Sequence, residues 1–119
     1  MAEKKIDRKD MSEFIDQVGD VLVQRVLEYY KFRTYKFPDV NNAMLFLVSE
    51  VGELADALVS NQEAWVRNNP KEKEALEVQQ EIGDIMMMLT VLTDRLNCPD
   101  PLNCMLENFA RKGFEEENA

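Results

Sequence analysis

The chain carries one five-residue pattern twice, as Glu50-Val51-Gly52-Glu53-Leu54 and as Glu81-Ile82-Gly83-Asp84-Ile85. Each copy places two carboxylates three residues apart inside an apolar stretch, so on an α-helix each pair projects from one face. Like charges at this spacing repel each other, and carboxylates on an otherwise buried face are costly to remove from water. The repetition is explained if something cationic lies between the two pairs.

The sequence around both copies predicts an all-α protein. Helix-forming residues dominate, only four glycines occur, and no segment alternates polar and apolar residues as a strand would. Start and stop signals mark four helices, at about residues 10–32, 40–60, 70–96 and 101–113. We therefore expect a four-helix bundle forming a single domain over residues 1–119, with residues 1–9 flexible and residues 114–119 an acidic tail.

The predicted helix ends depend on a few residues. Asp10, with Glu13 three positions later, has the pattern of a capping box at the start of the first helix. Asn69-Pro70 and Asp100-Pro101 each combine a capping residue with a proline at the first helical position, and Gly113 is typical of a helix end. The connection at residues 61–70 has room for one further helical turn.

The composition limits the classes of function. The net charge of −9 and the lack of a basic stretch argue against a nucleic-acid polymer or an anionic membrane as partner. The charged N-terminus has no secretory signal, and the apolar runs are too short to span a bilayer. Two cysteines form neither a disulfide framework nor a zinc site, so the reducing cytoplasm is the expected compartment.

The two acid pairs predict a metal centre. On a helix, residues three apart are about 4.5 Å apart along the axis, so each pair can hold one cation or bridge two. Two such helices side by side bring together Glu50, Glu53, Glu81 and Asp84, as in helix-bundle metal sites. Oxygen ligands without any histidine favour Mg²⁺, with Mn²⁺ as a substitute. The alternative is that both pairs lie on solvated faces of amphipathic helices.

Residues 47–54, Leu47-Val48-Ser49-Glu50-Val51-Gly52-Glu53-Leu54, followed by residues 81–85, resemble the MazG-like nucleoside triphosphate pyrophosphohydrolases. The resemblance is best from Phe37 to Leu92. It implies Mg²⁺-dependent cleavage between the α- and β-phosphates, which yields a nucleoside monophosphate and pyrophosphate. By motif position it makes the four acids metal ligands, and Glu50 or Glu53 then orients or deprotonates the attacking water.

The chain departs from the family pattern at three positions. Ser49 replaces the first glutamate of the family motif, although small dCTP-pyrophosphatase-like members also lack that acid. Ser60 and Met88 stand where those relatives place a tryptophan and often a tyrosine, so base recognition does not transfer. In many members the last helix supplies phosphate contacts, for which the nearest candidates are Asn108, Arg111 and Lys112.

Lys36 and Phe37 belong to a stretch that mixes cations with aromatic residues just before the second predicted helix, which carries the first acid pair. This stretch either stacks a base and holds phosphates, or is the basic end of an amphipathic helix. Both interpretations remain open from the sequence.

The second and third predicted helices are apolar on more faces than a monomer of 119 residues can cover. We therefore expect a homodimer or a homotetramer, with Met86, Met87 and Met88 filling the core or a subunit interface. The competing hypothesis for function is a non-catalytic helical dimerisation or adaptor protein that keeps the bundle. A ferritin-like di-iron bundle requires Glu-x-x-His pairs, which a chain without histidine does not have.

Overall fold

A computed structural model of the chain describes residues 8–33 and 39–117, and in this part the protein is all-α. The helices are α1 (Arg8–Arg33), α2 (Val40–Ser60), α3 (Gln62–Val66), α4 (Glu72–Arg95) and α5 (Pro101–Glu117). The four predicted helical segments are thus confirmed, and the short α3 occupies the connection between the second and the third.

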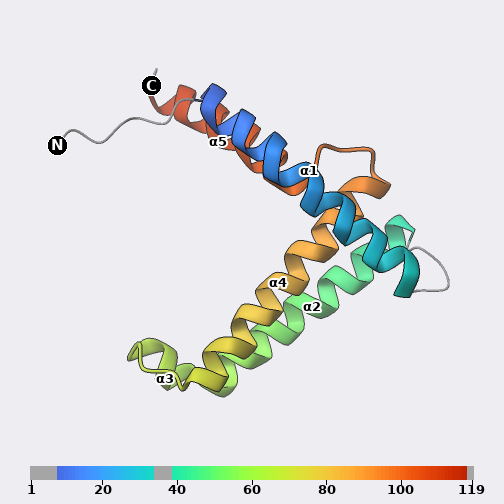
Figure 1. Cartoon of the computed structure of the whole chain (residues 1–119). Coiled ribbons are helices and arrows are strands. Elements are labelled where there is room, and N and C mark those ends of the chain that lie inside the picture. Colours follow the sequence, from blue (N-terminus) through green and yellow to red (C-terminus); the bar gives the residue numbers. More distant parts are fainter. Residues whose placement is uncertain (1–7, 34–38, 118–119) are drawn as a thin grey trace.

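The helices form two arms that meet at an angle (Figure 1). In one arm α2 and α4 run antiparallel, with α3 at its far end, and in the other α1 lies along α5. The α1 helix crosses α4 where the arms meet. The two acid-bearing segments therefore belong to the same pair of helices.

Two predicted helix starts are confirmed by their capping contacts. The Asn42 backbone N–H donates to Asp39 Oδ1 over 2.8 Å and caps α2. The Leu102 and Asn103 backbone N–H groups donate to Asp100 Oδ1 over 3.0 and 3.1 Å, so Pro101 opens α5 as expected. Both caps satisfy donors that the first helical turn leaves without a partner.

Three other predicted boundaries are wrong. Helix α1 begins at Arg8, so Asp10 lies inside the helix, and residues 8 and 9 of the segment expected to be flexible are helical. The rest of that segment, residues 1–7, lies outside the described residues. Helix α4 begins at Glu72, because the cap is at Lys71, whose backbone N–H donates to Glu74 Oε2 over 3.3 Å. Helix α5 continues through Gly113 to Glu117, so part of the expected acidic tail is helical.

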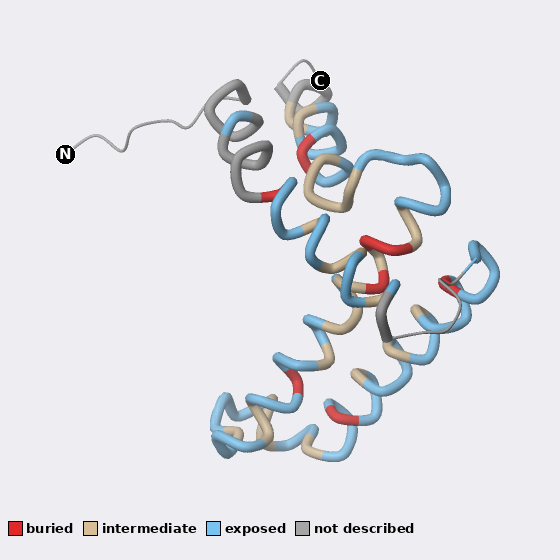
Figure 2. Tube along the Cα trace, turned by 45° about the vertical axis from the view of Figure 1, so that its right-hand side comes forward, coloured by how far each residue is buried: buried red, intermediate tan, exposed pale blue. Residues whose placement is uncertain are grey.

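The buried core lies where α1 crosses the α2–α4 pair. Its fully covered centre is Ala43 on α2 with Met88 and Val91 on α4. Partly buried side chains surround this centre: Leu27, Tyr30, Leu47 and Leu92. Farther along the α2–α4 arm the buried residues are Ala57 and Val78, and Figure 2 shows the exposed and intermediate positions that make up most of this arm. The core therefore joins α1, α2 and α4 at one point.

The chain is less compact than a single domain of its length. Its radius of gyration is 17.4 Å, whereas globular domains of this size have about 13.5 Å. Its accessible surface is 9639 Å², against about 6600 Å² for a folded monomer of this mass. Large apolar residues contribute to this surface, among them Leu45 (68% exposed) and Val59 (70%).

In the described ranges, no helix has both the length and the apolar character needed to cross a membrane.

Candidate metal centre

The antiparallel packing of α2 on α4 brings the predicted acids together. Glu50 and Glu53 come from α2, and Glu81 comes from α4. One carboxylate oxygen of each of these three residues lies within 4.8 Å of the other two. Asp84, one helical turn after Glu81, is outside this group of three but close enough for its charge to act on Glu50 and Glu81. This convergence brings the two acid pairs together, as a shared site requires, but exposed acidic groups also occur without a metal, so the metal centre stays a prediction.

Two carboxyl groups of the cluster, those of Glu50 and Glu81, have raised pKa values. Burial raises the pKa of Glu50, and repulsion from Glu53 and Asp84 and a hydrogen bond shared with Glu53 add to the effect. Burial also raises the pKa of Glu81, followed by repulsion from Glu53, a hydrogen bond with Glu53, and repulsion from Asp84 and Glu77. Glu53 therefore acts on both neighbours, and among the described residues no cationic side chain lowers the pKa of Glu50 or Glu81.

Two oxygens of the cluster lack hydrogen-bond partners. Among the described residues, Glu50 Oε2 and Glu81 Oε2 are buried and receive no hydrogen bond. A buried carboxylate oxygen without a donor is costly, unless a cation neutralises it. Two oxygen ligands of one Mg²⁺ at 2.0–2.1 Å are at most about 4.2 Å apart, so the observed spacing suits a single ion after a small side-chain adjustment. The residues thus fit a divalent cation.

The cluster faces an open hollow of about 260 Å³. Its lining combines acids and small polar residues: Glu53, Asp56, Ala57, Ser60, Asn61, Glu77 and Glu81. A larger hollow of about 650 Å³ lies at the corner of α2 and α3 and shares Ser60 and Asn61 with the first. Glu63 is the one titratable residue in its lining, whereas four acids line the smaller hollow.

Sequence reasoning missed two residues of the site. Glu77, one turn before Glu81, lines the hollow and raises the pKa of Glu81. Tyr30 on α1 is close enough to Asp84 and Glu50 that their charges, after burial, raise its own pKa. The sequence could have indicated Glu77, because it lies four residues before Glu81 and therefore on the same face of the helix. Tyr30 continues the apolar stripe of α1 four residues after Val26, but only the crossing of α1 over α4 shows what it faces.

The predicted substrate-binding residues lie apart from the carboxylates or outside the described chain. Lys36 and Phe37 are in the segment that the structure does not describe. Asn108, Arg111 and Lys112 are exposed on α5, where the Arg111 guanidinium donates to Asn108 Oδ1 over 2.9 Å. Helix α5 packs against α1 and α4 and makes no contact with α2. Phosphate binding by these residues stays a prediction.

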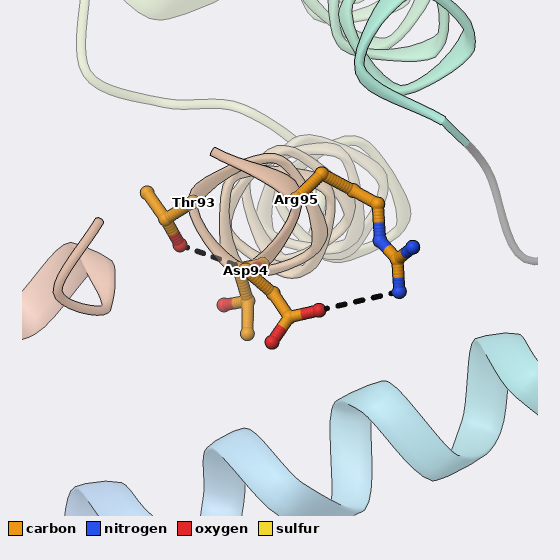
Figure 3. Close-up of polar contacts among 4 residues, drawn as sticks. Thr93, Asp94 and Arg95 are labelled. Atoms are coloured by element: carbon orange, nitrogen blue, oxygen red, sulfur yellow. Dashed lines mark hydrogen bonds and ion pairs between the residues drawn. The ribbon is translucent and has the colours of Figure 1, made fainter. Parts of the chain in front are cut away.

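Another hollow, of about 440 Å³, lies between α1 and the end of α4. Two acids and two bases line it, Glu28 and Asp94 with Lys31 and Arg95. Figure 3 shows Arg95 and Asp94 extending to the same side of α4, where their ion pair spans 3.5 Å. Because the charges balance, this hollow has no preference for an anion or a cation.

Comparison with known proteins adds no identification. No family model matches the chain, and no curated protein matches it either. The family resemblance therefore depends on the motifs at residues 47–54 and 81–85 alone.

Proposed function

We propose that this chain is a Mg²⁺-dependent nucleoside triphosphate pyrophosphohydrolase with a MazG-like four-helix bundle, acting in the cytoplasm. It would cleave the α–β phosphoanhydride of (deoxy)nucleoside triphosphates to a monophosphate and pyrophosphate, and so clear unwanted nucleotides from the pool. The observation that carries the proposal is the convergence of Glu50, Glu53 and Glu81, with two buried oxygens that lack donors.

The proposed roles of the acids follow from how exposed each side chain is. Glu50 and Glu81 are partly buried, and their orphaned oxygens are the ones suited to hold the ion. Glu53 is exposed and lines the hollow, where it can orient a water molecule or accept its proton. When bound, Mg²⁺ supplies positive charge to the triphosphate and lowers the pKa of water. Asp84 adds negative charge that strengthens the attraction for the ion.

A non-catalytic dimerisation or adaptor protein is the second candidate. The observation in its favour is the large exposed apolar surface of α2 and α4. It gives no reason for a cluster of carboxylates with raised pKa between the same two helices. The hydrolase accounts for both the acids and the hollow beside them.

The test is pyrophosphate release from a panel of natural and modified nucleoside triphosphates, with Mg²⁺, with Mn²⁺ and with a chelator. We expect metal-dependent release that falls about 100-fold or more in Glu53→Gln and Asp84→Asn. The matched control is Asp20→Asn, because Asp20 is an exposed acid on α1 outside the cluster. Release that survives the chelator, or that both site variants leave unchanged, would contradict the proposal.

A further inference from the structure

The antiparallel helices α2 and α4 place matching residues at successive levels along their arm. Where α1 crosses, Ala43 of α2 and Val91 of α4 are both fully buried in the core. Glu50 and Asp84 are seven residues away from them on the two helices, toward the end of the arm that carries α3 (Figure 1). Seven residues are about two helical turns, so both acids lie on the core side of their helices, about 10.5 Å along the axis from the crossing.

Tyr30 brings α1 to this part of the arm. Its side chain is partly buried and packs against the core cluster of Ala43, Met88 and Val91. Met88 follows Asp84 by one helical turn on α4, which is about 6 Å along the axis and nearly the same face. The core that holds the ring of Tyr30 therefore ends about one turn from the acids.

The hydroxyl of Tyr30 is close to one acid from each helix. Burial raises the pKa of Tyr30, and the negative charges of Asp84 and Glu50 raise it further. Among the described residues, Glu53 and Glu81 do not add to this effect, although they are only about 4.5 Å farther along the arm. The electrostatics agree with the packing, and both place the phenol oxygen beside Glu50 and Asp84.

The carboxylate cluster therefore has two ends with different surroundings. At the end toward α3, Glu53 and Glu81 line the open hollow of about 260 Å³. Glu50 and Asp84 do not line it, and they lie at the end toward the α1 crossing. A cation held between the acids would be accessible from the hollow on one side and would have Tyr30 on the other.

We propose that Tyr30 is a positioning residue of the candidate metal centre. Its hydroxyl donates to a carboxylate oxygen of Glu50 or Asp84, directly or through a water molecule of the bound ion, and so holds these acids toward the cation. The inference rests on the proposed function for the presence of the ion. The contact between the hydroxyl and the acids does not require the ion.

A phenol suits this place because it is neutral and can both donate and accept a hydrogen bond. A donor is needed there, since Glu50 Oε2 is buried and receives no hydrogen bond from the described residues. A lysine or arginine would meet the same need, but its positive charge would compete with the metal ion. Mg²⁺ usually keeps several water molecules, and one of these can donate to the phenol oxygen. Hydrogen bonds of this kind orient the ligands of protein metal sites.

The ring of Tyr30 is held independently of its hydroxyl. The ring packs on the core, and it meets Tyr29 edge to face, with ring centroids 5.3 Å apart and planes at 84°. This is a favoured geometry for an aromatic pair. Phenylalanine would keep both contacts, so Tyr30→Phe removes the hydroxyl and leaves the packing in place.

The first test measures Mg²⁺ affinity by isothermal titration calorimetry. We expect Tyr30→Phe to weaken binding at least about tenfold, as is typical when a hydrogen-bond partner of a metal ligand is removed. The matched control is Tyr29→Phe, the same change at the neighbouring position, which is 42% exposed. The control should bind within about twofold of the natural chain. Equal affinities of the natural chain and Tyr30→Phe would overturn the proposal.

Pyrophosphate release adds a readout that a purely structural role would not change. Because Tyr30 acts through the ion, a higher Mg²⁺ concentration should restore the rate of Tyr30→Phe almost to that of the natural chain. The KM for the nucleotide should then be unchanged. A raised KM or a lowered rate that persists at saturating Mg²⁺ would mean that the hydroxyl contacts the substrate, and would overturn the positioning role.

The second test needs no metal ion and uses thermal melts in the presence of a chelator. Tyr30→Phe should lower the melting temperature of the natural chain by a few degrees, because a hydrogen bond is lost. The same change should have almost no effect in a chain that already carries Glu50→Gln and Asp84→Asn. Equal effects in both backgrounds would show that the hydroxyl does not act on these acids.

The two tests separate this inference from the proposed hydrolase. Coupling of Tyr30 to the acids in chelator, in a chain that binds no Mg²⁺, would contradict the hydrolase and support the contact. Mg²⁺ binding and hydrolysis that Tyr30→Phe leaves unchanged would contradict the inference alone.

Discussion

At the scale of single residues, Glu53 has the widest influence on the candidate site. It repels both Glu50 and Glu81 and shares hydrogen bonds with both. Without a cation, three neighbouring acids strain the folded state. If the proposed cation binds, the same acids would be its ligands. Glu53 therefore lowers the stability of the metal-free protein by repulsion and at the same time favours the proposed metal binding.

Glu53→Gln should raise the melting temperature of the metal-free protein by a few degrees, because it removes one charge from the cluster and adds an amide donor. The same change should abolish most of the stabilisation by Mg²⁺. Thermal melts with chelator and with Mg²⁺ measure both effects. Asp56→Asn is the control, because Asp56 lines the same hollow but contributes to neither raised pKa. A metal-free variant less stable than the natural chain would be inconsistent with the repulsion.

The raised pKa values of Glu50 and Glu81 also predict how stability depends on pH. A carboxyl whose pKa is higher in the folded state than its ordinary 4.5 binds its proton more tightly when folded. Its contribution to stability is present below pH 4.5 and is lost as the pH rises through the raised values. We therefore expect the metal-free melting temperature to fall across this window, and Mg²⁺ to restore it at the upper end.

The measurement is a series of melts from pH 4 to pH 8, with and without Mg²⁺. Glu50→Gln with Glu81→Gln should flatten the difference between the two series, because no titrating carboxyl with a raised pKa remains. A metal-free stability that increases through the same window would show that the two pKa values are not raised.

The repeated acid pattern made the convergence of residues 50, 53 and 81 predictable from sequence. Helical periodicity fixes which residues of one helix share a face, and two matched pairs imply a common neighbour. Tyr30 was not predictable in the same way. It reaches the acids only because α1 crosses the pair, and that angle depends on packing among residues far apart in the sequence.

At the scale of helices, the helix starts that were predicted correctly are those where the predicted capping residue accepts hydrogen bonds in the structure. Asp39 and Asp100 each accept hydrogen bonds from their helix's first turn, and both starts were correct. Asp10 and Asn69 have the right chemistry but stand at positions the backbone does not use as caps. Gly113 adopts no positive φ, so it does not terminate α5.

Asp100→Ala tests the stronger cap. Its two carboxylate oxygens accept from the Leu102 and Asn103 backbones and, over 2.7 Å, from the Asn103 side chain. Losing them should lower the free energy of unfolding by about 1 kcal/mol. Urea titration measures the change, and Asp20→Ala on the exposed side of α1 should stay within about 0.5 kcal/mol. Equal effects of the two substitutions would mean that the cap contributes nothing.

At the scale of the whole molecule, the excess of apolar residues was visible in the sequence, but its location was not. Composition showed that two helices were apolar on too many faces. It did not show that α1 would cover the side near Tyr30 and leave the side of Val48 and Met86 open. Which face is covered depends on the angle between the arms, a property that no local pattern encodes.

If the exposed apolar residues of α2 and α4 drive association, as the sequence predicts, the melting temperature of the chain should depend on its concentration. Ligands that bind only the folded state stabilise it by mass action, and for a homodimer the ligand is a second protomer. We expect the melting temperature of the natural chain to rise by several degrees over a hundredfold increase in concentration, measured by calorimetry with chelator present. Val48→Glu should melt lower and independently of concentration, whereas Val21→Glu should follow the natural chain. A melt of the natural chain that does not depend on concentration would show that association contributes nothing to its stability.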